Sequence, residues 1–373
     1  MNCGANLDIL VKMSNRYGKN EEFVLAGGGN TSYKERDILY VKGSGTSLAK
    51  ISREQFVAMD LKKLQEQVER EYPVCADDAE NEKKVLSDMM AARIPGEEAK
   101  RPSVESILHA MFPYKLVLHL HPPLINGLTC GKNGKEMCGE IFKETAVWVD
   151  LTKPGLTLAQ ICNRLFNEYL KKTGKYPQIA ILQNHGIFVS ADTIEEIDKL
   201  MEYAVEKIES RMNDIEKPNF EAITITFDMD LLHEISEALK KLYNAAIFCT
   251  NKQVAQFVKN KEAFKPISKS FTPDHIVHCK DEPLFIESEA DLETELYAYK
   301  ERKGFKPNIV AVKGIGFFAL GSSVEKAEQT QALYLDTIKI ATYAKAFGGV
   351  SPLSDEFANF ILNWEVEAYR SKV

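Results

Sequence analysis

The chain has 373 residues, of which 45% are hydrophobic and 27% are charged, and its net charge is −7. This length can bury a sizeable core and favours two domains over one. The acidic balance excludes an overall attraction for nucleic acid or for an anionic membrane surface. We therefore expect small molecules and further copies of the same chain, in a dimer or tetramer, as partners.

Targeting signals and disulfide patterns are both missing from the sequence. No segment is apolar over the roughly 20 residues that a membrane-spanning helix needs, and the start, MNCGANLDILVKMSNRYG, lacks the features of a signal peptide. The seven cysteines are odd in number and include no CxxC pair, which argues against a disulfide framework or a zinc ribbon. The sequence thus predicts a soluble cytoplasmic protein with reduced, structural cysteines.

Predicted elements alternate between helix and strand from the start of the chain. Apolar residues spaced i, i+3, i+4 predict a helix over 5–17, and VLAGGGNTSYKERDILYVKGSG (24–45) predicts strand, glycine turn, strand and turn. Charged stretches at 53–72 and 78–92 favour helices. PSVESILHAMFP (102–113) predicts a helix that begins behind a proline, and the strand LVLHLH follows it.

The region from 135 to 212 completes a first domain. Helices are predicted at 135–146 and 157–172, and residues 178–212 read as a strand, a turn at 184–186, a second strand and a long amphipathic helix capped near residue 192 or 193. The predicted fold class is α/β, with three layers in the order α/β/α. The polar, proline-containing segment NDIEKPNF (213–220) predicts a boundary between domains at 1–215 and 220–373.

The second half repeats part of the first half. NIVAVKGIGFFALGSSVEKAEQ, which begins at Asn308, matches QIAILQNHGIFVSADTIEEIDK, which begins at Gln178, at an offset of 130 residues. His185, however, corresponds to Ile315. The second copy has kept what folding requires and lost a polar side chain, so we expect a smaller, degenerate copy without metal ligands. Matching positions include Ile179 with Ile309, Gly186 with Gly316, Phe188 with Phe318 and Glu195 with Glu325.

Two histidines separated by one residue stand in the apolar run LVLHLHPP. Side chains alternate between the two faces of a strand, so His119 and His121 point to the same side. Two imidazoles on one face suit a metal ion with nitrogen ligands roughly 2.0–2.1 Å away. The alternative is a pair of half-exposed histidines on an edge strand.

Two further residues favour the metal interpretation. His185 lies in a tight Asn-His-Gly turn between apolar strands, and Glu105 lies near the start of the helix that leads into the histidine strand. Three histidines and one carboxylate match a catalytic divalent-metal site, in which the carboxylate can also act as an acid or base.

A second pattern consists of two glycine-rich turns, GGGNTS (27–32) and KGSGTS (42–47). Such turns expose backbone N–H groups that can surround a phosphate, and Lys42 could add positive charge. Ser103, two residues before Glu105, could add a hydroxyl. The turns fit neither GxGxxG nor a Walker loop, so nucleotide binding is disfavoured, and a purely structural hairpin is the alternative.

Taken in order, GGGNTS, KGSG, PSVES, HLHPP and NHGIFV resemble the class II aldolase/adducin family over roughly residues 7–212. The resemblance implies a central sheet with helices on both faces, usually in a homotetramer, and a resident Zn²⁺, with Mn²⁺ or Co²⁺ as alternatives. It implies that His119, His121 and His185 ligate the metal, that Glu105 ligates it and moves the proton, and that Gly29, Asn30, Ser44, Gly45 and Ser103 bind phosphate.

The activity implied by this resemblance is cleavage of a phosphorylated ketose through a metal-stabilised enediolate, which gives dihydroxyacetone phosphate and an aldehyde. The PS-x-E form and the second half look most like the aldolase part of bifunctional rhamnulose-1-phosphate aldolase/alcohol dehydrogenase proteins. No dinucleotide fingerprint supports redox chemistry. Val104 stands where phosphate-binding members usually have a second serine, so one hydroxyl contact to a phosphate is missing.

Other functions of the family remain alternatives. Sugar-phosphate epimerases typically have an aspartate at the position of Glu105, which favours the aldolase, while a decarboxylase or dehydratase stays open. A non-catalytic scaffold, as in adducin, is the alternative from another class.

Several remaining side chains are weaker candidates. We expect no second metal site at His275 and His278, which have no evident carboxylate partner, and a structural role for His109. Tyr114 and Tyr176 are candidates for the proton donor to the leaving fragment.

Overall fold

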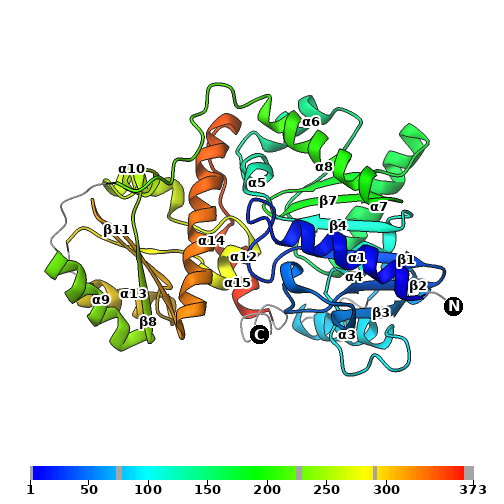
Figure 1. Ribbon diagram of the computed structural model, residues 1–373, viewed down its shortest axis with the longest axis horizontal. Coiled ribbons are helices and arrows are strands. Elements are labelled where there is room, and N and C mark those ends of the chain that lie inside the picture. Colours follow the sequence, from blue (N-terminus) through cyan, green and yellow to red (C-terminus); the bar gives the residue numbers. More distant parts are fainter. Residues whose placement is uncertain (1–2, 73–77, 224–228, 289–291, 365–373) are drawn as a thin grey trace. The chain divides into compact units, whose positions relative to one another are not determined.

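The computed structural model describes residues 3–72, 78–223, 229–288 and 292–364, which form two compact units (Figure 1). The first unit contains the chain up to Ile125 together with Lys135–Arg211. The second contains Asn126–Gly134 and the chain from Met212 onward. The division after Arg211 lies next to the polar segment 213–220, but the sequence does not predict that Asn126–Gly134 joins the second unit.

A seven-stranded sheet forms the centre of the first unit, with the strand order β3-β2-β1-β4-β7-β6-β5. Neighbouring strands are antiparallel except for β5 and β6, which are parallel. The histidine strand β4 therefore lies in the interior of the sheet, between β1 and β7. The strands are β1 (Asn30–Glu35), β2 (Ile38–Lys42), β3 (Phe56–Asp60), β4 (Leu116–Leu120), β5 (Val147–Val149), β6 (Ile179–Leu182) and β7 (Gly186–Ala191).

Helices cover the sheet of the first unit, giving the mixed α/β fold that the sequence predicts (Figure 1). Helix α1 packs against β1 and α8 against β4 and β7, while α4 packs against β2 and α7 against β5. One large apolar core joins the sheet to α2, α3, α4 and α7, and it contains Val117, Ile107 and Phe166. The helices are α1 (Cys3–Gly18), α2 (Leu61–Glu69), α3 (Asp78–Ala91), α4 (Ser106–Met111), α5 (Pro123–Thr129), α6 (Gly134–Phe142), α7 (Leu156–Thr173) and α8 (Ile194–Glu209).

Two local predictions in the first unit are wrong. The stretch before the three glycines is not a strand, and the β1–β2 hairpin turns at Arg36 and Asp37, because Arg36 adopts the left-handed conformation with φ of 54°. Residues 53–72 are not one helix, since a short 3₁₀ turn and strand β3 precede α2. Burial of the apolar start of β3 against β2 outweighs the helical preference of the charged residues around it.

The second unit contains a four-stranded sheet with the order β8-β11-β10-β9. Strands β9 and β10 are parallel, and the other neighbours are antiparallel. Helix α13 connects β9 to β10, and α14 follows β11, just as α7 connects β5 to β6 and α8 follows β7. The strands are β8 (Ala245–Cys249), β9 (Leu284–Ile286), β10 (Ile309–Val312) and β11 (Gly316–Gly321). The helices are α9 (Met229–Tyr243), α10 (Lys252–Phe257), α11 (Lys261–Phe264), α12 (Pro273–Cys279), α13 (Leu292–Lys303), α14 (Val324–Tyr343) and α15 (Asp355–Asn363).

Turn hydrogen bonds in the two units correspond as well. The His185 N–H donates to Leu182 O at 3.2 Å, and the Ile315 N–H donates to Val312 O at 3.1 Å. Helices α7 and α13 both end in a left-handed glycine, with φ of 76° at Gly174 and 77° at Gly304. The sheet β4-β7-β6-β5 and the sheet β8-β11-β10-β9 thus share strand order, strand direction and turn geometry.

Candidate metal centre

Three imidazole rings converge at the end of strand β4. The Nε2 atom of His119 lies 2.9 Å from Nε2 of His121 and 3.3 Å from Nε2 of His185. Within the residues that the structure describes, these histidines are the one group of three or more potential ligands close enough to share a metal ion. The three rings therefore meet as the alternation in LVLHLH and the Asn-His-Gly turn predict.

His119 is held rigidly within the sheet. In the ladder it lies opposite Asn30 on one side and Phe188 on the other, and its side chain is fully buried. Its ring stacks on Phe188 with the centroids 4.0 Å apart, and Nδ1 lies 3.0 Å from the backbone oxygen of Ile187. This contact requires a proton on Nδ1, which leaves the lone pair of Nε2 directed at the cluster. The alternative of half-exposed histidines on an edge strand is therefore wrong.

The other two histidines come from turns. His185 lies in the connection between β6 and β7, where the preceding Asn184 adopts a φ of 54°. His121 lies one residue beyond the last residue of β4, and its N–H donates to Phe23 O at 3.1 Å. A Cβ atom added at Gly186 would lie 2.3 Å from Leu120 O and 2.8 Å from Cδ2 of His121. Only glycine lets the His185 turn approach the end of β4 this closely.

Glu105 completes the cluster from the first residue before helix α4. Its Oε1 atom lies 3.3 Å from Nε2 of His119 and 3.4 Å from Nε2 of His185. Burial raises the pKa of Glu105, but the charge and hydrogen bond of His119 and the charges of His185 and His121 outweigh burial and hold that pKa well below its usual range. The carboxylate is thus anionic and faces two of the three rings.

The three imidazoles are close enough to one another to share a single divalent ion. Ligands about 2.0–2.1 Å from a tetrahedral Zn²⁺ are roughly 3.3–3.4 Å from one another. The distances from Glu105 to His119 and to His185, and from His119 to His185, are 3.3–3.4 Å, whereas His119 and His121 are 2.9 Å apart. Three imidazole nitrogens, with a carboxylate beside two of them, form a donor set for a metal such as zinc.

The first glycine-rich segment lies beside this cluster. The Asn30 amide donates to the Ser103 hydroxyl and, at 3.5 Å, to Oε2 of Glu105. The Glu105 N–H also donates to the Ser103 oxygen, at 3.3 Å. Asn30 therefore contacts the predicted metal-binding carboxylate, and Ser103 contacts both Asn30 and the backbone of Glu105. Gly29 precedes Asn30 and lies against His119, because an added Cβ would be 3.0 Å from His119 O.

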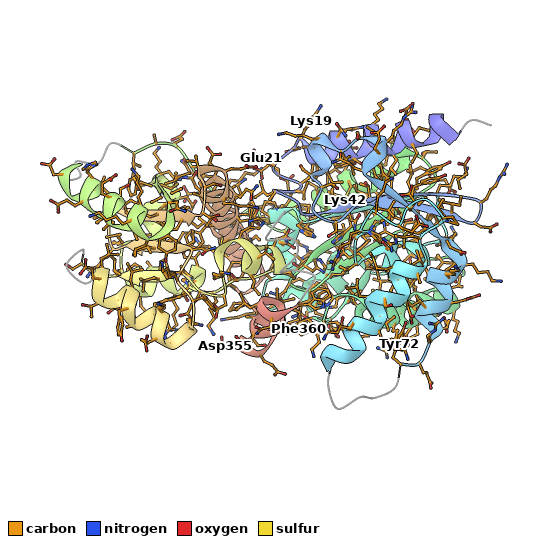
Figure 2. The ribbon with its side chains drawn as sticks, turned by 90° about the horizontal axis from the view of Figure 1, so that it is seen from below. Lys19, Glu21, Lys42, Tyr72, Asp355 and Phe360 are labelled. Atoms are coloured by element: carbon orange, nitrogen blue, oxygen red, sulfur yellow. The ribbon has the colours of Figure 1, made fainter. Side chains whose placement is uncertain are left out.

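Lys42 has a different position from the one that the sequence suggests. Its ammonium group, labelled in Figure 2, donates to the backbone oxygens of Gly27 at 2.7 Å, Gly28 at 3.3 Å and Gly29 at 2.7 Å. The side chain is almost fully buried. Lys42 therefore fixes the three-glycine loop, and the sequence gives no direct signal for this contact.

The second glycine-rich turn lies next to the segment that carries Ser103. The Ser44 N–H donates to Arg101 O at 2.8 Å, and the Ser103 N–H donates to Lys42 O at 3.1 Å. Gly45 follows in the left-handed conformation, with φ of 81°. The five predicted phosphate binders thus lie on three segments: the two glycine-rich turns and the stretch before α4 that carries Ser103. Val104 instead packs against the apolar core.

Three weaker candidates lie apart from the metal centre. His109 is fully buried under the sheet with Nδ1 2.7 Å from the Ser32 hydroxyl, and burial holds its pKa well below the usual value, so it stays neutral. The Tyr114 hydroxyl donates to Tyr176 O at 3.1 Å. Tyr114 precedes β4 and His119 lies near its end, five residues or roughly 16 Å further along an extended chain, so neither tyrosine reaches the cluster in the same chain.

His275 does have a carboxylate partner, contrary to the prediction from sequence. Its Nε2 atom lies 3.0 Å from Oδ2 of Asp336 on α14, and both side chains are buried. The partner is 61 residues away in the sequence, which is why no local pattern indicates it. The pair lies in the second unit and joins α12 to α14, so its role is structural.

Three histidines close enough to share a metal ion, on a mixed α/β fold, are what this geometry defines. The family model described as the class II aldolase and adducin N-terminal domain matches residues 9–211, more than half of the chain. The chain therefore belongs to the class II aldolase/adducin family.

Individual relatives have low sequence identity to this chain. It is 24% identical over 410 residues to the "Uncharacterized oxidoreductase YuxG" of Bacillus subtilis (strain 168), an alignment that covers 97% of this chain and 57% of that protein. The chain thus spans a little over half the length of that relative.

Two of the solved structures that match cover a little over half of the chain. The N-terminal class II aldolase domain of a conserved protein from Thermoplasma acidophilum is 26% identical, with a TM-score of 0.47, over 57% of this chain and 96% of that chain. An L-fuculose-1-phosphate aldolase from Thermus thermophilus is 16% identical, with a TM-score of 0.37, over 56% of this chain and 95% of that chain.

No described helix is both long enough and apolar enough to cross a membrane. The five cysteines whose state is described, from Cys130 to Cys279, are free thiols.

Proposed function

We propose that the protein is a metal-dependent aldehyde-lyase that cleaves a ketose, in its phosphorylated form, to dihydroxyacetone phosphate and an aldehyde. The observation that carries this proposal is the convergence of Glu105, His119 and His185 with mutual distances of 3.3–3.4 Å, together with His121 at 2.9 Å from His119. Family membership supports it as well.

Four side chains would hold the metal: His119, His121, His185 and Glu105. A bound Zn²⁺, or Mn²⁺ or Co²⁺ in its place, supplies Lewis acidity that stabilises negative charge on the substrate's oxygens when a carbon–carbon bond breaks. The protein fixes the donor set in advance, because His119 is locked in the sheet and its Nδ1 proton is held by Ile187 O.

Glu105 is the proposed acid and base. Its Oε1 atom faces the imidazoles, while its Oε2 atom faces the Asn30 amide. A carboxylate that is anionic at neutral pH can accept the proton that the substrate's hydroxyl loses on cleavage and return a proton to the enediolate carbon.

The substrate's phosphate is proposed to bind at the two glycine-rich loops. The Ser103 oxygen accepts hydrogen bonds from Asn30 and Glu105, so its own proton is directed elsewhere and can be donated. Ser44 and Gly45 lie on the adjacent loop, and Gly29 lies on the loop that Lys42 fixes. Backbone N–H groups and hydroxyls of this kind bind phosphate without a further basic side chain.

A direct test is a screen of phosphorylated ketoses for release of dihydroxyacetone phosphate. The full chain is assayed with added Zn²⁺ and again after treatment with a chelator. Release that depends on the metal and that is lost in His119→Ala supports the proposal. Absence of turnover with every ketose removes the lyase assignment but leaves the metal centre to be tested separately.

The same protein preparation can be used to test two alternatives: another enzymatic activity of the family and a non-catalytic scaffold. An epimerase, decarboxylase or dehydratase would convert its substrate with the same metal dependence but without release of dihydroxyacetone phosphate. A scaffold of the adducin kind would hold no stoichiometric metal, and His119→Ala would leave every property unchanged. The convergence of three imidazoles, with the Glu105 carboxylate beside two of them, favours an enzyme over a scaffold.

We also propose that the second unit is a degenerate copy of part of the first. The matching strand order, the turn at Ile315 and the left-handed Gly304 support this, together with the sequence match that begins at Asn308. On this proposal the copy has retained its fold and lost its ligands.

A further inference from the structure

The segment that leads into α4 runs antiparallel to the second glycine-rich turn of the first unit. Gly43 and Pro102 are bridge partners, and the Ser44 N–H donates to Arg101 O at 2.8 Å. Residues directly opposite each other in an antiparallel pair direct their side chains to the same face, so Ser44 and Arg101 share a face. Side chains also alternate along an extended segment, which places Arg101 on the same face as Ser103.

This face borders the proposed metal centre. The Ser103 oxygen accepts hydrogen bonds from the Asn30 amide and from the Glu105 N–H. Lys42 lies opposite Ser103 in the same pair, and its ammonium group donates to the backbone oxygens of the three-glycine loop. Arg101 precedes Ser103 by two residues, roughly 6.6 Å along an extended segment, so its side chain begins beside these groups.

The Arg101 side chain is partly enclosed by the protein. The residue is half-buried, and its Nε atom is buried. Enclosure of this end of the guanidinium limits the positions that the group can take, while an arginine side chain carries its positive charge at every physiological pH. Val104 packs against the apolar core and offers no hydroxyl on this segment. Arg101 therefore adds a positive charge to a face that otherwise presents hydroxyls and backbone N–H groups.

We propose that Arg101 binds the phosphate group of the substrate and makes the site selective for phosphorylated over unphosphorylated ketoses. A guanidinium presents its N–H donors as a planar fork that matches two oxygens of a phosphate. Hydroxyls such as those of Ser44 and Ser103 can bond to charged and uncharged groups alike, whereas a positive charge favours an anion. This inference rests on the proposed function and names the side chain that recognises the charge of the substrate.

The first test measures phosphate binding without turnover. The metal-stripped full chain is titrated calorimetrically with inorganic phosphate. We expect Arg101→Gln to bind phosphate about 10- to 100-fold more weakly than wild type, because charge-assisted hydrogen bonds are lost. Arg101→Lys should have an intermediate affinity, since an ammonium group keeps the charge but lacks the fork. The control Arg70→Gln, which removes an exposed ion pair with Asp88 in the same unit, should match wild type.

Two further readouts separate a ligand from a structural residue. Circular dichroism and Co²⁺ titration of each variant check that the fold and the proposed metal centre are intact. With a phosphorylated ketose that wild type cleaves, Arg101→Gln should raise KM about tenfold or more and leave kcat close to wild type. The rate with the unphosphorylated ketose should not change. If Arg101→Gln does not fold, the more conservative Arg101→Lys supplies the same comparison.

The outcomes distinguish this inference from the proposed function. If the arginine variants bind inorganic phosphate as tightly as wild type, Arg101 is not a phosphate ligand and the lyase assignment stands. If wild type binds no phosphate, the inference is wrong and the proposed phosphate site falls with it. If phosphate binding depends on Arg101 but no ketose is cleaved, the inference is supported and the lyase assignment is wrong.

Discussion

The sheet of the second unit has the same strand order and directions as four strands of the first unit's sheet, β4-β7-β6-β5, but different side chains at the positions of the three histidines. In the first unit His119 is opposite Phe188 across the ladder, and in the second unit Phe248 is opposite Phe318. Phe248 and Ile315 pack with Phe318 in the apolar core of the second unit. By this register the equivalent pairs are His119 with Phe248, His121 with Thr250, and His185 with Ile315.

The comparison separates what the fold needs from what a ligand needs. Gly186 and Gly316 are both glycine, and an added Cβ would lie 2.3 Å from Leu120 O in one unit and 2.5 Å from Cys249 O in the other. The close approach of turn and strand is thus common to both units. At the three equivalent positions imidazoles occur in the first unit alone, where they bury polar atoms that an apolar side chain would not. On the proposed function, a bound metal ion rather than packing accounts for the three imidazoles.

The strongest test of this comparison is to replace the three histidines of the first unit by the side chains at the equivalent positions of the second unit. The triple variant His119→Phe, His121→Thr, His185→Ile should fold, with a free energy of unfolding within about 1–2 kcal/mol of the metal-free wild type. Activity should fall by about 1000-fold or more, because several kcal/mol of Lewis-acid stabilisation are lost. Assays of turnover and urea denaturation measure the two effects.

The matched control for this transplant is in the other unit. Phe248→Ala should destabilise the protein by about 2 kcal/mol, since Phe248 is partly buried, and should leave metal binding unchanged. If the triple variant keeps its activity, or if Phe248→Ala abolishes metal binding, the assignment of the two sites is wrong.

Substitution of Glu105 gives the next largest effect. Glu105 is the one carboxylate among the four proposed donors, and it is the proposed acid and base. Glu105→Gln keeps the side chain's volume and its contact with Asn30 but removes the charge. We expect kcat to fall by about 100-fold and Co²⁺ affinity to fall by about tenfold. Steady-state kinetics at saturating metal separate the two effects. An unchanged kcat would show that another group moves the proton.

The paired glycines give a smaller and more selective effect. Gly186→Ala and Gly316→Ala should each destabilise by about 2 kcal/mol, because the added methyl group collides with a backbone oxygen in both units. Gly186→Ala alone should also weaken Co²⁺ binding, since its Cβ lies 2.8 Å from the ring of His121. Thermal melts and Co²⁺ titrations of both variants test this. Equal Co²⁺ affinities in the two variants would contradict it.

The smallest expected effect is a change in stability on substituting Lys34. This residue lies on β1, a strand of the first unit that has no counterpart in the sheet of the second. Burial lowers the pKa of Lys34, on β1, to about 7, whereas the unfolded chain keeps the usual value. Between these two pKa values the unfolded state binds more protons, so stability rises with pH. Lys34→Met should therefore raise the free energy of unfolding near pH 7. The gain should be only about 1 kcal/mol, because water screens the partly exposed amine.

The pH dependence supplies the check on Lys34→Met. Its advantage over wild type should shrink as the pH rises from 7 towards 10, where the folded wild type has already lost the proton. Urea denaturation at pH 7 and pH 9.5 measures the difference. An advantage that grows with pH would mean that the amine is charged in the folded protein.

Local patterns were enough to predict that the three histidines lie together, but not what surrounds them. The period of two in LVLHLH predicts that His119 and His121 share a face, and the Asn-His-Gly turn predicts a special role for His185. Contacts between distant segments escape such patterns: the Lys42 ammonium on the three-glycine loop, Asp336 beside His275, and the docking of residues 126–134 in the second unit. Strand β3 was missed because charged neighbours mask its short apolar run.

The most direct test of the account is the metal stoichiometry of the full chain. Metal-stripped protein is titrated calorimetrically with Zn²⁺, and the triple variant that carries the side chains of the second unit is titrated in parallel. The account predicts one tightly bound ion per wild-type chain and none in the variant. A wild type that binds no ion, or a variant that binds as many ions as the wild type, would contradict it.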